Sequence, residues 1–224
     1  MELEVLFEDN HIIIVNKPKN IIVQSDLTGD KPLEEFVKDY IKVKYNKPGE
    51  VFLGVVHRID RPVSGIVLFA RTSKALTRLN EQFKSKEIKK TYWAIVKNKP
   101  QPAASILKHH IYRDTKINKS TAYDKPSKDS KEASLAYITK ASSDNYHLLE
   151  IDLHTGRHHQ IRCQLSKIGC PIKGDLKYGF PRSNPNGGIS LHAYSISFNH
   201  PVTKENISIT APTPIDDIWS AFSK

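Results

Sequence analysis

The sequence has few of the features that mark secreted, membrane-bound or nucleotide-binding proteins. It contains 2 cysteines in 224 residues, too few for a disulfide framework, which agrees with a reducing compartment. The longest apolar runs, Ile12–Val15 and Ile66–Ala70, are far shorter than the roughly 20 residues of a membrane helix. The acidic, strand-like first residues resemble neither a signal nor a transit peptide, and glycine-rich phosphate loops and the G-x-S-x-G motif do not occur. We therefore expect a cytoplasmic protein that does not enter a membrane and binds no nucleotide cofactor.

What the sequence does have is positive charge. The 34 Lys and Arg residues exceed the 24 Asp and Glu residues, which gives a formal net charge of +10. On a folded chain this charge favours a polyanionic partner, most simply nucleic acid. A basic surface without any partner is equally compatible with the charge alone. Because no shift in composition separates two regions, we expect one domain over residues 1–224.

Apolar periodicity predicts more strands than helices, and the two do not alternate regularly. This pattern favours an α+β fold with a mixed, mostly antiparallel sheet. Asp30 and Ser73 are the expected N-caps of the first two helices. The basic segment Lys97–Lys131 is expected to form long loops with short strands near 106–112, and its lysines are either solvated or in contact with RNA. Helices are predicted over 33–41, 75–83, 161–168 and 215–222, and strands over 3–8, 12–15, 51–56, 65–70, 92–96, 135–139, 146–153, 189–198 and 207–211.

An acidic residue lies between two arginines just after a predicted strand. Asp60 is flanked by Arg58 and Arg61 in the segment His57–Gly65. Neighbouring guanidinium groups favour the ionised carboxylate, which suits a nucleophile or a base. A structural ion pair next to a turn explains the same residues.

Two more segments carry basic and aromatic residues in suggestive patterns. Thr155-Gly156 ends a strand, and the basic residues after it open a helix whose free N–H groups and dipole favour phosphate. The segment Lys89–Trp93 combines lysines with aromatic rings, as grooves for nucleic acid do. A solvated helix face and an ordinary core strand are the alternatives. A metal site is a rival interpretation, because His159 and Cys163 are four residues apart, but the short cysteine spacing of structural zinc sites is absent.

Taken together, these segments resemble the RluA-type family of pseudouridine synthases. The signature H-R-L-D-x-x-T-S-G is matched by His57–Gly65, and T-G-R-x-H-Q-I-R is matched by Thr155–Arg162 without a gap. The resemblance runs in family order over about residues 5–212. Its further blocks are Asn16-Lys17-Pro18, Lys90–Val96, Gly169–Gly179, Leu191-His192-Ala193 and Phe198–Pro201.

The resemblance implies an isomerase that converts uridine in RNA to pseudouridine without metal or cofactor. It implies that Asp60 is the catalytic carboxylate, as nucleophile or base, that Arg162 pairs with it, and that Tyr92 packs on the uracil. Because a uridine in folded RNA must leave the helix to be reached, Arg58 is expected to fill the vacated space. The implied fold is an α+β sheet with a central cleft flanked by helices and loops. The other residues expected to bind RNA are His57, Arg61, Lys17, Lys89, Lys90, Arg157, His159, Gln160, Ile161 and Lys173.

The sequence departs mildly from the family pattern. Ile59 and Val63 replace the commoner Leu and Thr, and Gln164 stands where many members have His. No segment before the first strand is long enough for the small RNA-binding domain of many relatives, so recognition is expected to depend on the catalytic domain. We expect a monomer that binds a stem-loop of ribosomal or transfer RNA. A catalytically silent RNA-binding module and a metal-dependent hydrolase are the alternative functions.

Overall fold

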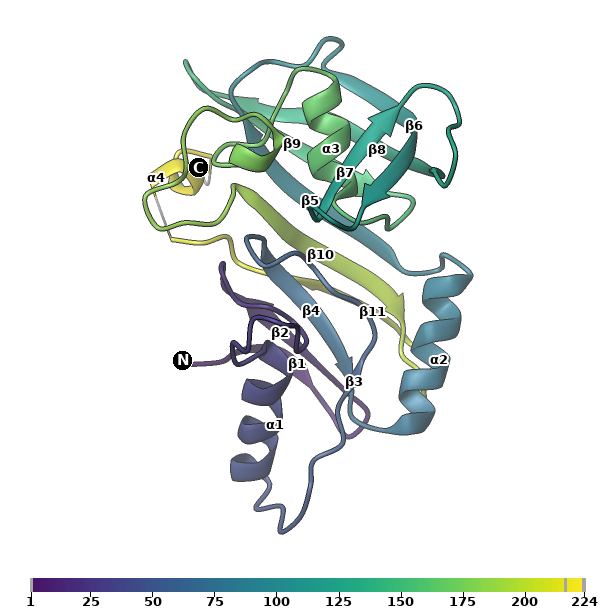
Figure 1. Ribbon diagram of the computed structural model, residues 1–224. Helices are drawn as coiled ribbons and strands as arrows, with labels where there is room; N and C mark the ends of the chain where they lie inside the picture. The colour runs from purple at the N-terminus through teal and green to yellow at the C-terminus, as the bar shows by residue number, and fades with distance from the viewer. Residues whose placement is uncertain (1, 216, 223–224) are drawn as a thin grey trace. The chain divides into compact units, whose positions relative to one another are not determined.

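The computed structural model describes residues 2–215 and 217–222, and contacts divide the chain into two compact units. Unit 1 runs to Lys89 and includes Ala193–Thr213, and unit 2 comprises Lys90–His192 and the chain from Pro214. Unit 1 contains β1 (Glu4–Glu8), β2 (Ile12–Lys17), α1 (Leu33–Lys44), β3 (Gly54–Val55), β4 (Ser64–Ala70), α2 (Ser73–Lys84), most of β10 (Leu191–Asn199) and β11 (Asn206–Thr210). Unit 2 contains β5 (Lys89–Val96), β6 (Ala104–Asp114), β7 (Lys119–Tyr123), β8 (Lys131–Ser142), β9 (His147–Leu153), α3 (Gln160–Lys167), the 3-10 helix η1 (Leu176–Tyr178) and α4 (Asp217–Ser220) (Figure 1).

The sheet of unit 1 has the strand order β1-β2-β4-β10, with β3 beside β4 and β11 beside β10. The pairs β1–β2, β2–β4 and β10–β11 are antiparallel. Every residue of β4 is buried, which explains its unbroken apolar sequence, because a strand covered on both faces needs apolar side chains at successive positions. Helix α2 packs its buried residues on one face of β2 and β4. The core there includes Ile12, Ile14, Ile66, Leu68, Ala75 and Leu79.

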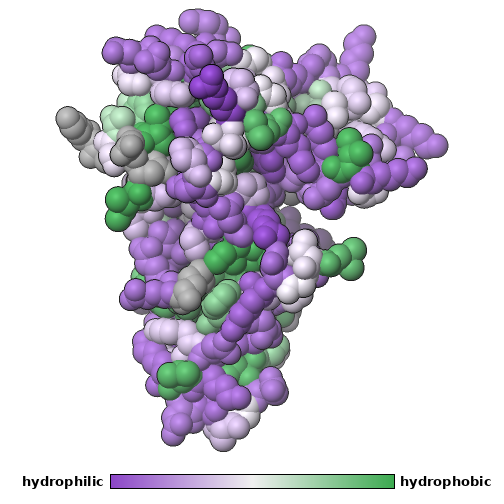
Figure 2. Space-filling model, turned by 60° about the vertical axis from the view of Figure 1, so that its left-hand side comes forward, coloured by the Kyte–Doolittle hydropathy of each residue, from purple (hydrophilic) through white to green (hydrophobic). Residues whose placement is uncertain are grey.

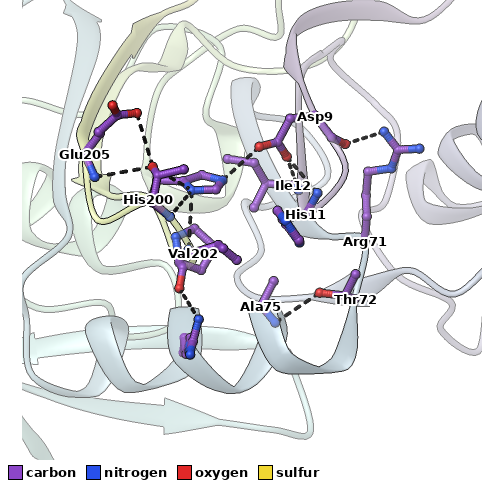
Figure 3. Close-up of polar contacts among 12 residues, drawn as sticks. Asp9, His11, Ile12, Arg71, Thr72, Ala75, His200, Val202 and Glu205 are labelled. Atoms are coloured by element: carbon purple, nitrogen blue, oxygen red, sulfur yellow. Dashed lines mark hydrogen bonds and ion pairs between the residues drawn. The ribbon is translucent and has the colours of Figure 1, made fainter.

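A cluster of polar contacts fixes the tight turn between β1 and β2 (Figure 3). Asp9 Oδ1 accepts hydrogen bonds from the backbone N–H groups of His11 and Ile12, each at 2.8 Å. Asp9 Oδ2 lies 2.9 Å from Nε2 of the buried His200. Nδ1 of His200 accepts the backbone N–H of Thr203 at 3.0 Å, which fixes the ring beside Asp9. The Arg71 guanidinium also donates to the backbone carbonyl of Asp9, so the turn is held from three directions.

The sheet of unit 2 has the order β5-β9-β8-β6-β7, and each neighbouring pair is antiparallel. Helix α3 contacts β6 and β7, where Cys163 packs with Ile111, Ala122 and Tyr178. At the other end, Trp219 of α4 is fully buried against β5 and β9. The mostly antiparallel α+β architecture predicted from the sequence is confirmed in both units.

Several local predictions are wrong. The segment 97–131 forms β6, β7 and the start of β8 rather than long loops, because its alternating residues 107, 109 and 111 are buried. The cap of α2 is Thr72, whose hydroxyl accepts the N–H of Ala75, instead of Ser73. Pro32 occupies the N-cap position of α1, and Asp30 forms an ion pair with Arg61 instead. Ile215 is fully exposed outside α4, and of the strand expected over 51–56 only Gly54–Val55 forms.

The visible surface in Figure 2 is mainly hydrophilic, with hydrophobic residues scattered singly or in small groups. Such scattering is normal for a protein surface and marks no binding area. Over the described residues, no helix combines the length and apolar character needed to cross a membrane.

Candidate active site

Asp60 lies on a short turn of unit 1 that is anchored by buried neighbours. Ile59 is 7% exposed and Val63 is 2% exposed, whereas Asp60 between them is half-buried. The backbone carbonyl of Asp60 accepts the N–H of Val63 at 3.0 Å, which closes the turn. The apolar side chains therefore fix the backbone and leave the carboxylate at the surface of the unit.

Lys17 supports this turn from inside. Its side chain is completely buried, and Nζ donates to the backbone carbonyls of Pro18 (3.0 Å), Ile21 (2.7 Å) and Arg61 (3.1 Å). Burial lowers the pKa of Lys17 to about 7, although the negative charge of Asp60 acts in the opposite direction. Two of these contacts lie in the loop that follows Lys17, and the third joins it to the residue after Asp60. A contact of Lys17 with phosphate stays a prediction.

The arginines beside Asp60 have other contacts within unit 1. Arg61 forms an exposed ion pair with Asp30 at 2.7 Å, and Arg58 donates to the side chain of Gln24 at 3.2 Å. Both arginine side chains are exposed and remain accessible to a ligand.

His57 and Gly65 hold the two ends of the segment that contains Asp60. His57 Nε2 accepts the backbone N–H of Leu68 at 3.0 Å, and its ring stacks on Phe83 at 5.2 Å. This placement makes His57 part of the packing under the turn. Gly65 has a φ of +112°, and a Cβ there would lie 2.3 Å from the carbonyl oxygen of Ala193, so only glycine fits.

In unit 2, the loop before α3 is closed by the side chain of Gln160. Its Oε1 accepts from the Thr155 hydroxyl at 2.7 Å and from the backbone N–H of Arg157 at 3.0 Å, and its Nε2 donates to the carbonyl of Ser134 at 3.1 Å. Gln160 and Ile161 are buried in the structure, and the RNA contacts predicted for both residues stay predictions. Arg157 is exposed, although its Nε donates to the Glu132 carbonyl at 3.0 Å.

Arg162 forms a buried bidentate ion pair with Asp175. Nε lies 2.7 Å from one carboxylate oxygen and Nη2 lies 2.9 Å from the other. The two side chains are 5% and 1% exposed, and the guanidinium also lies 4.9 Å from the centre of the Tyr178 ring. Two parallel bonds fix the plane of a guanidinium as well as its charge. The predicted pairing of Arg162 with Asp60 would join unit 2 to unit 1 and stays a prediction.

Tyr178 organises the start of α3. Its hydroxyl accepts the backbone N–H of Ser120 at 2.9 Å and lies 2.9 Å from Nδ1 of His159. His159 is buried, and its pKa is lowered to about 2, mainly by burial and then by the charge of Arg162. Burial thus favours the neutral ring of His159, and the prediction that this residue binds RNA stays a prediction.

Four further residues predicted to contact RNA differ in exposure. Three of them belong to β5, and the fourth is Lys173. Tyr92 is 8% exposed and lies opposite Ile151 in β9. Lys89 is exposed, whereas burial lowers the pKa of Lys90. The ammonium of Lys90 lies beside Gly156, where the Cβ of any other residue would be 3.7 Å from Nζ. Lys173 is half-buried, and its ammonium donates to the Asn184 side chain at 2.6 Å.

Sequence reasoning missed the roles of Asp175 and Tyr178. Both lie in the block Gly169–Gly179, whose spacing carries the family resemblance but does not reveal which partner each residue has. It also left Gln164 unexplained. This side chain is fully buried and its Nε2 lies 2.9 Å from Nδ1 of His109, which joins α3 to β6. Over the described ranges, no group of three or more His, Cys, Asp or Glu residues is arranged to hold a metal ion.

The chain was compared with known families, proteins and structures. The family described as RNA pseudouridylate synthase matches residues 11–167. The chain is 32% identical over 216 residues to an uncharacterized RNA pseudouridine synthase of Bacillus subtilis, covering 96% of this chain and 70% of the relative. It is also 32% identical over 238 residues to tRNA pseudouridine synthase C of Haemophilus influenzae, covering 97% and 95% of the two chains. Ribosomal large subunit pseudouridine synthase C of the same species is 35% identical over 222 residues, covering 94% of this chain and 65% of the relative.

The fold is similar to that of solved structures. Human RNA pseudouridylate synthase domain containing 4 aligns with a TM-score of 0.80 at 22% identity, covering 98% of this chain and 92% of the other. Human RNA pseudouridylate synthase domain containing 1 aligns with a TM-score of 0.76 at 22% identity, covering 98% and 87% of the two chains.

Proposed function

Because this chain belongs to the RNA pseudouridylate synthase family, and is therefore an isomerase, we propose that it modifies uridines in structured ribosomal or transfer RNA. Relatives named for each of these RNAs are about equally similar to the chain, at 32% identity for the transfer RNA enzyme and 35% for the ribosomal one. The net charge of +10 supports a large RNA as the substrate, since phosphates are neutralised by lysine and arginine.

Asp60 is the proposed catalytic carboxylate, and its position on a rigid turn is the observation that carries the proposal. A catalytic group must be held in one geometry by its neighbours. The buried side chains of Ile59 and Val63 and the hydrogen bond from Lys17 to the Arg61 carbonyl supply that rigidity, while Asp60 is left half-buried.

The surrounding residues take the other proposed roles. A uridine in a stem-loop has to be turned out of its stack before a carboxylate reaches its ribose, at a cost of a few kcal/mol. Arg58 is exposed two residues before Asp60, and a long cationic side chain there can fill the space that the base leaves. Tyr92 is proposed to pack against the uracil and Arg162 to stabilise the charge of Asp60. Arg61, Lys89, Lys90, Arg157 and Lys173 remain proposed contacts to the RNA.

The proposed reaction uses side chains of this chain alone. Asp60 either attacks C1′ of the ribose and forms an ester as the glycosidic C–N bond breaks, or removes a ribose proton as that bond breaks. The freed uracil turns and its C5 bonds to C1′, which breaks the ester in the first route and is accompanied by return of the proton to the ribose in the second. The C5 proton then leaves, and N1 of the uracil takes up a proton. The uridine and the pseudouridine have the same atoms, so the reaction needs no oxidant and no second substrate.

The test is pseudouridine mapping on unmodified ribosomal and transfer RNA incubated with the purified chain in the presence of EDTA. Wild type is compared with Asp60→Asn, which has the same shape without the charge. The matched control is Asp39→Asn, an exposed carboxylate of α1 that pairs with Lys31. We expect wild type and the control to produce pseudouridine and Asp60→Asn to produce none while it binds the RNA as tightly as wild type.

Other outcomes separate the competing functions. Pseudouridine formed by Asp60→Asn would exclude Asp60 as the catalytic carboxylate. RNA binding without product from wild type on any of the RNAs would point to a silent binding module. A product that forms only when EDTA is omitted would indicate a metal requirement and contradict the proposed reaction.

A further inference from the structure

The hairpin of β6 and β7 is fastened to the start of α3 and to η1. The backbone N–H of Ser120 donates to the Tyr178 hydroxyl at 2.9 Å, and Ser120 Oγ lies 2.8 Å from Nδ1 of His158. From η1, Lys177 Nζ donates to the carbonyl of Asn118 in the hairpin turn at 3.1 Å. These contacts lie within unit 2 and make the hairpin tip a fixed part of its surface.

Cationic side chains gather where these elements meet. Arg113 is exposed and lies directly opposite Ser120 in the β6–β7 register, so the two residues face the same side of the hairpin. Lys119 Nζ lies 5.5 Å from the centre of the Tyr178 ring, and Lys177 is exposed beside it. The charges of Arg113 and Lys177 both contribute to lowering the pKa of the buried His159.

One carboxylate lies beside this group of three cations. Asp114 is the only acidic residue between 104 and 123, it lies opposite Lys119 in the β6–β7 register, and its carboxylate accepts the backbone N–H groups of Lys116 and Ile117 in the hairpin turn. In the described part of the chain, no carboxylate pairs with Arg113, Lys119 or Lys177. Like charges held together repel each other unless an anion lies among them. The first N–H groups of α3 add further positive potential at the same place.

We propose that Arg113, Lys119 and Lys177 form a phosphate-binding site for the RNA backbone within unit 2. The inference rests on the proposed function for the identity of the anion, since a cationic cluster by itself also suits an acidic peptide. An RNA chain is the better fit because the chain belongs to a family that acts on RNA, and phosphate contacts from basic side chains position a protein on nucleic acid. The site positions a part of the RNA that does not react.

The test compares two triple variants of the full chain, each of which loses three positive charges. The site variant carries Arg113→Gln, Lys119→Gln and Lys177→Gln, and glutamine keeps a donor for the Asn118 carbonyl. The control variant carries Lys42→Gln, Lys74→Gln and Lys84→Gln, three exposed lysines of α1 and α2. Binding to unmodified transfer RNA is measured from 50 to 300 mM salt, with circular dichroism to confirm folding, and pseudouridine formation is followed under single-turnover conditions.

We expect the site variant to bind RNA about tenfold more weakly, with a smaller salt dependence. Each phosphate contact contributes about 0.7 to 0.9 to the magnitude of the slope of log K against log salt, so three lost contacts reduce that magnitude by about 2 to 3. The reaction rate at saturating RNA should stay near the wild-type value, because the chemistry at Asp60 is untouched. The control variant should keep the wild-type slope within about 0.5.

Distinct results would overturn the inference and the proposed function. Equal affinities and slopes for the site and control variants would refute the phosphate site while wild type still forms pseudouridine. Polyglutamate that displaces RNA from wild type but not from the site variant would assign the cluster to an acidic peptide. Failure of wild type to form pseudouridine on any RNA would instead refute the proposed function.

Discussion

Replacing Asp175 by asparagine removes the carboxylate that neutralises a buried guanidinium. Arg162 is 5% exposed and Asp175 is 1% exposed, and two bonds of 2.7 and 2.9 Å join them. Removing one partner of such a pair leaves the other buried charge without its bidentate counterion, at a cost of about 3–5 kcal/mol. For a chain of this size, that loss lowers the melting temperature by about 6–20 °C.

The assay is urea unfolding of four proteins: wild type, Asp175→Asn, Arg162→Met and the double variant. The free energies of unfolding form a cycle from which the coupling between the two side chains is obtained. Because removing both charges leaves neither one unpaired, we expect the double variant to be more stable than Asp175→Asn alone. The double variant should nevertheless fail to form pseudouridine, since Arg162 is proposed to act on Asp60.

Two results would refute this reasoning. A loss below about 1 kcal/mol for Asp175→Asn would mean that solvent or another group neutralises Arg162. Additive effects of the two single substitutions would mean that the pair has no energetic coupling. Full activity of the folded double variant would remove Arg162 from the proposed machinery and reduce the pair to a structural one.

Three further predictions concern single residues. Because the pKa of Lys17 is lowered to about 7 in the folded chain, the unfolded chain binds more protons than the folded chain above that pH. Relative to Lys17→Met, the unfolding free energy of wild type should therefore rise by up to about 1.4 kcal/mol per pH unit from pH 7 to 10. A difference between the two proteins that does not change with pH would contradict this. Gly65→Ala should lower stability by more than about 3 kcal/mol in denaturant titrations, because its Cβ would lie 2.3 Å from the Ala193 carbonyl oxygen; near-normal stability would show that the backbone can move. Tyr178→Phe leaves the buried N–H of Ser120 without its acceptor and should lower the free energy of unfolding by about 1–3 kcal/mol. Amide hydrogen exchange in β7 should also become faster. Unchanged exchange would show that the Tyr178 hydroxyl does not hold the hairpin.

Local patterns determined most of the secondary structure and the identity of the key segments. Alternating apolar residues located most of the strands, because burial of one sheet face has a period of two residues along the chain. Ordered motifs such as His57–Gly65 and Thr155–Arg162 indicated the family, which the match to residues 11–167 confirms. The basic segment 97–131 was wrongly predicted as loops, because its lysines interrupt the apolar pattern, although buried and exposed residues alternate along β6.

Only the tertiary structure decided what each polar side chain of the motifs does. The sequence marks Lys17, His159 and Gln160 as polar and therefore as candidates for RNA contacts, yet all three are buried and bonded within the protein. Their partners are supplied by chain segments that folding brings alongside them, and local periodicity contains no information about those contacts. The same reason applies to Arg162, whose charge was evident from the sequence, whereas its buried partner Asp175 became evident only when α3 and the segment before η1 were seen together.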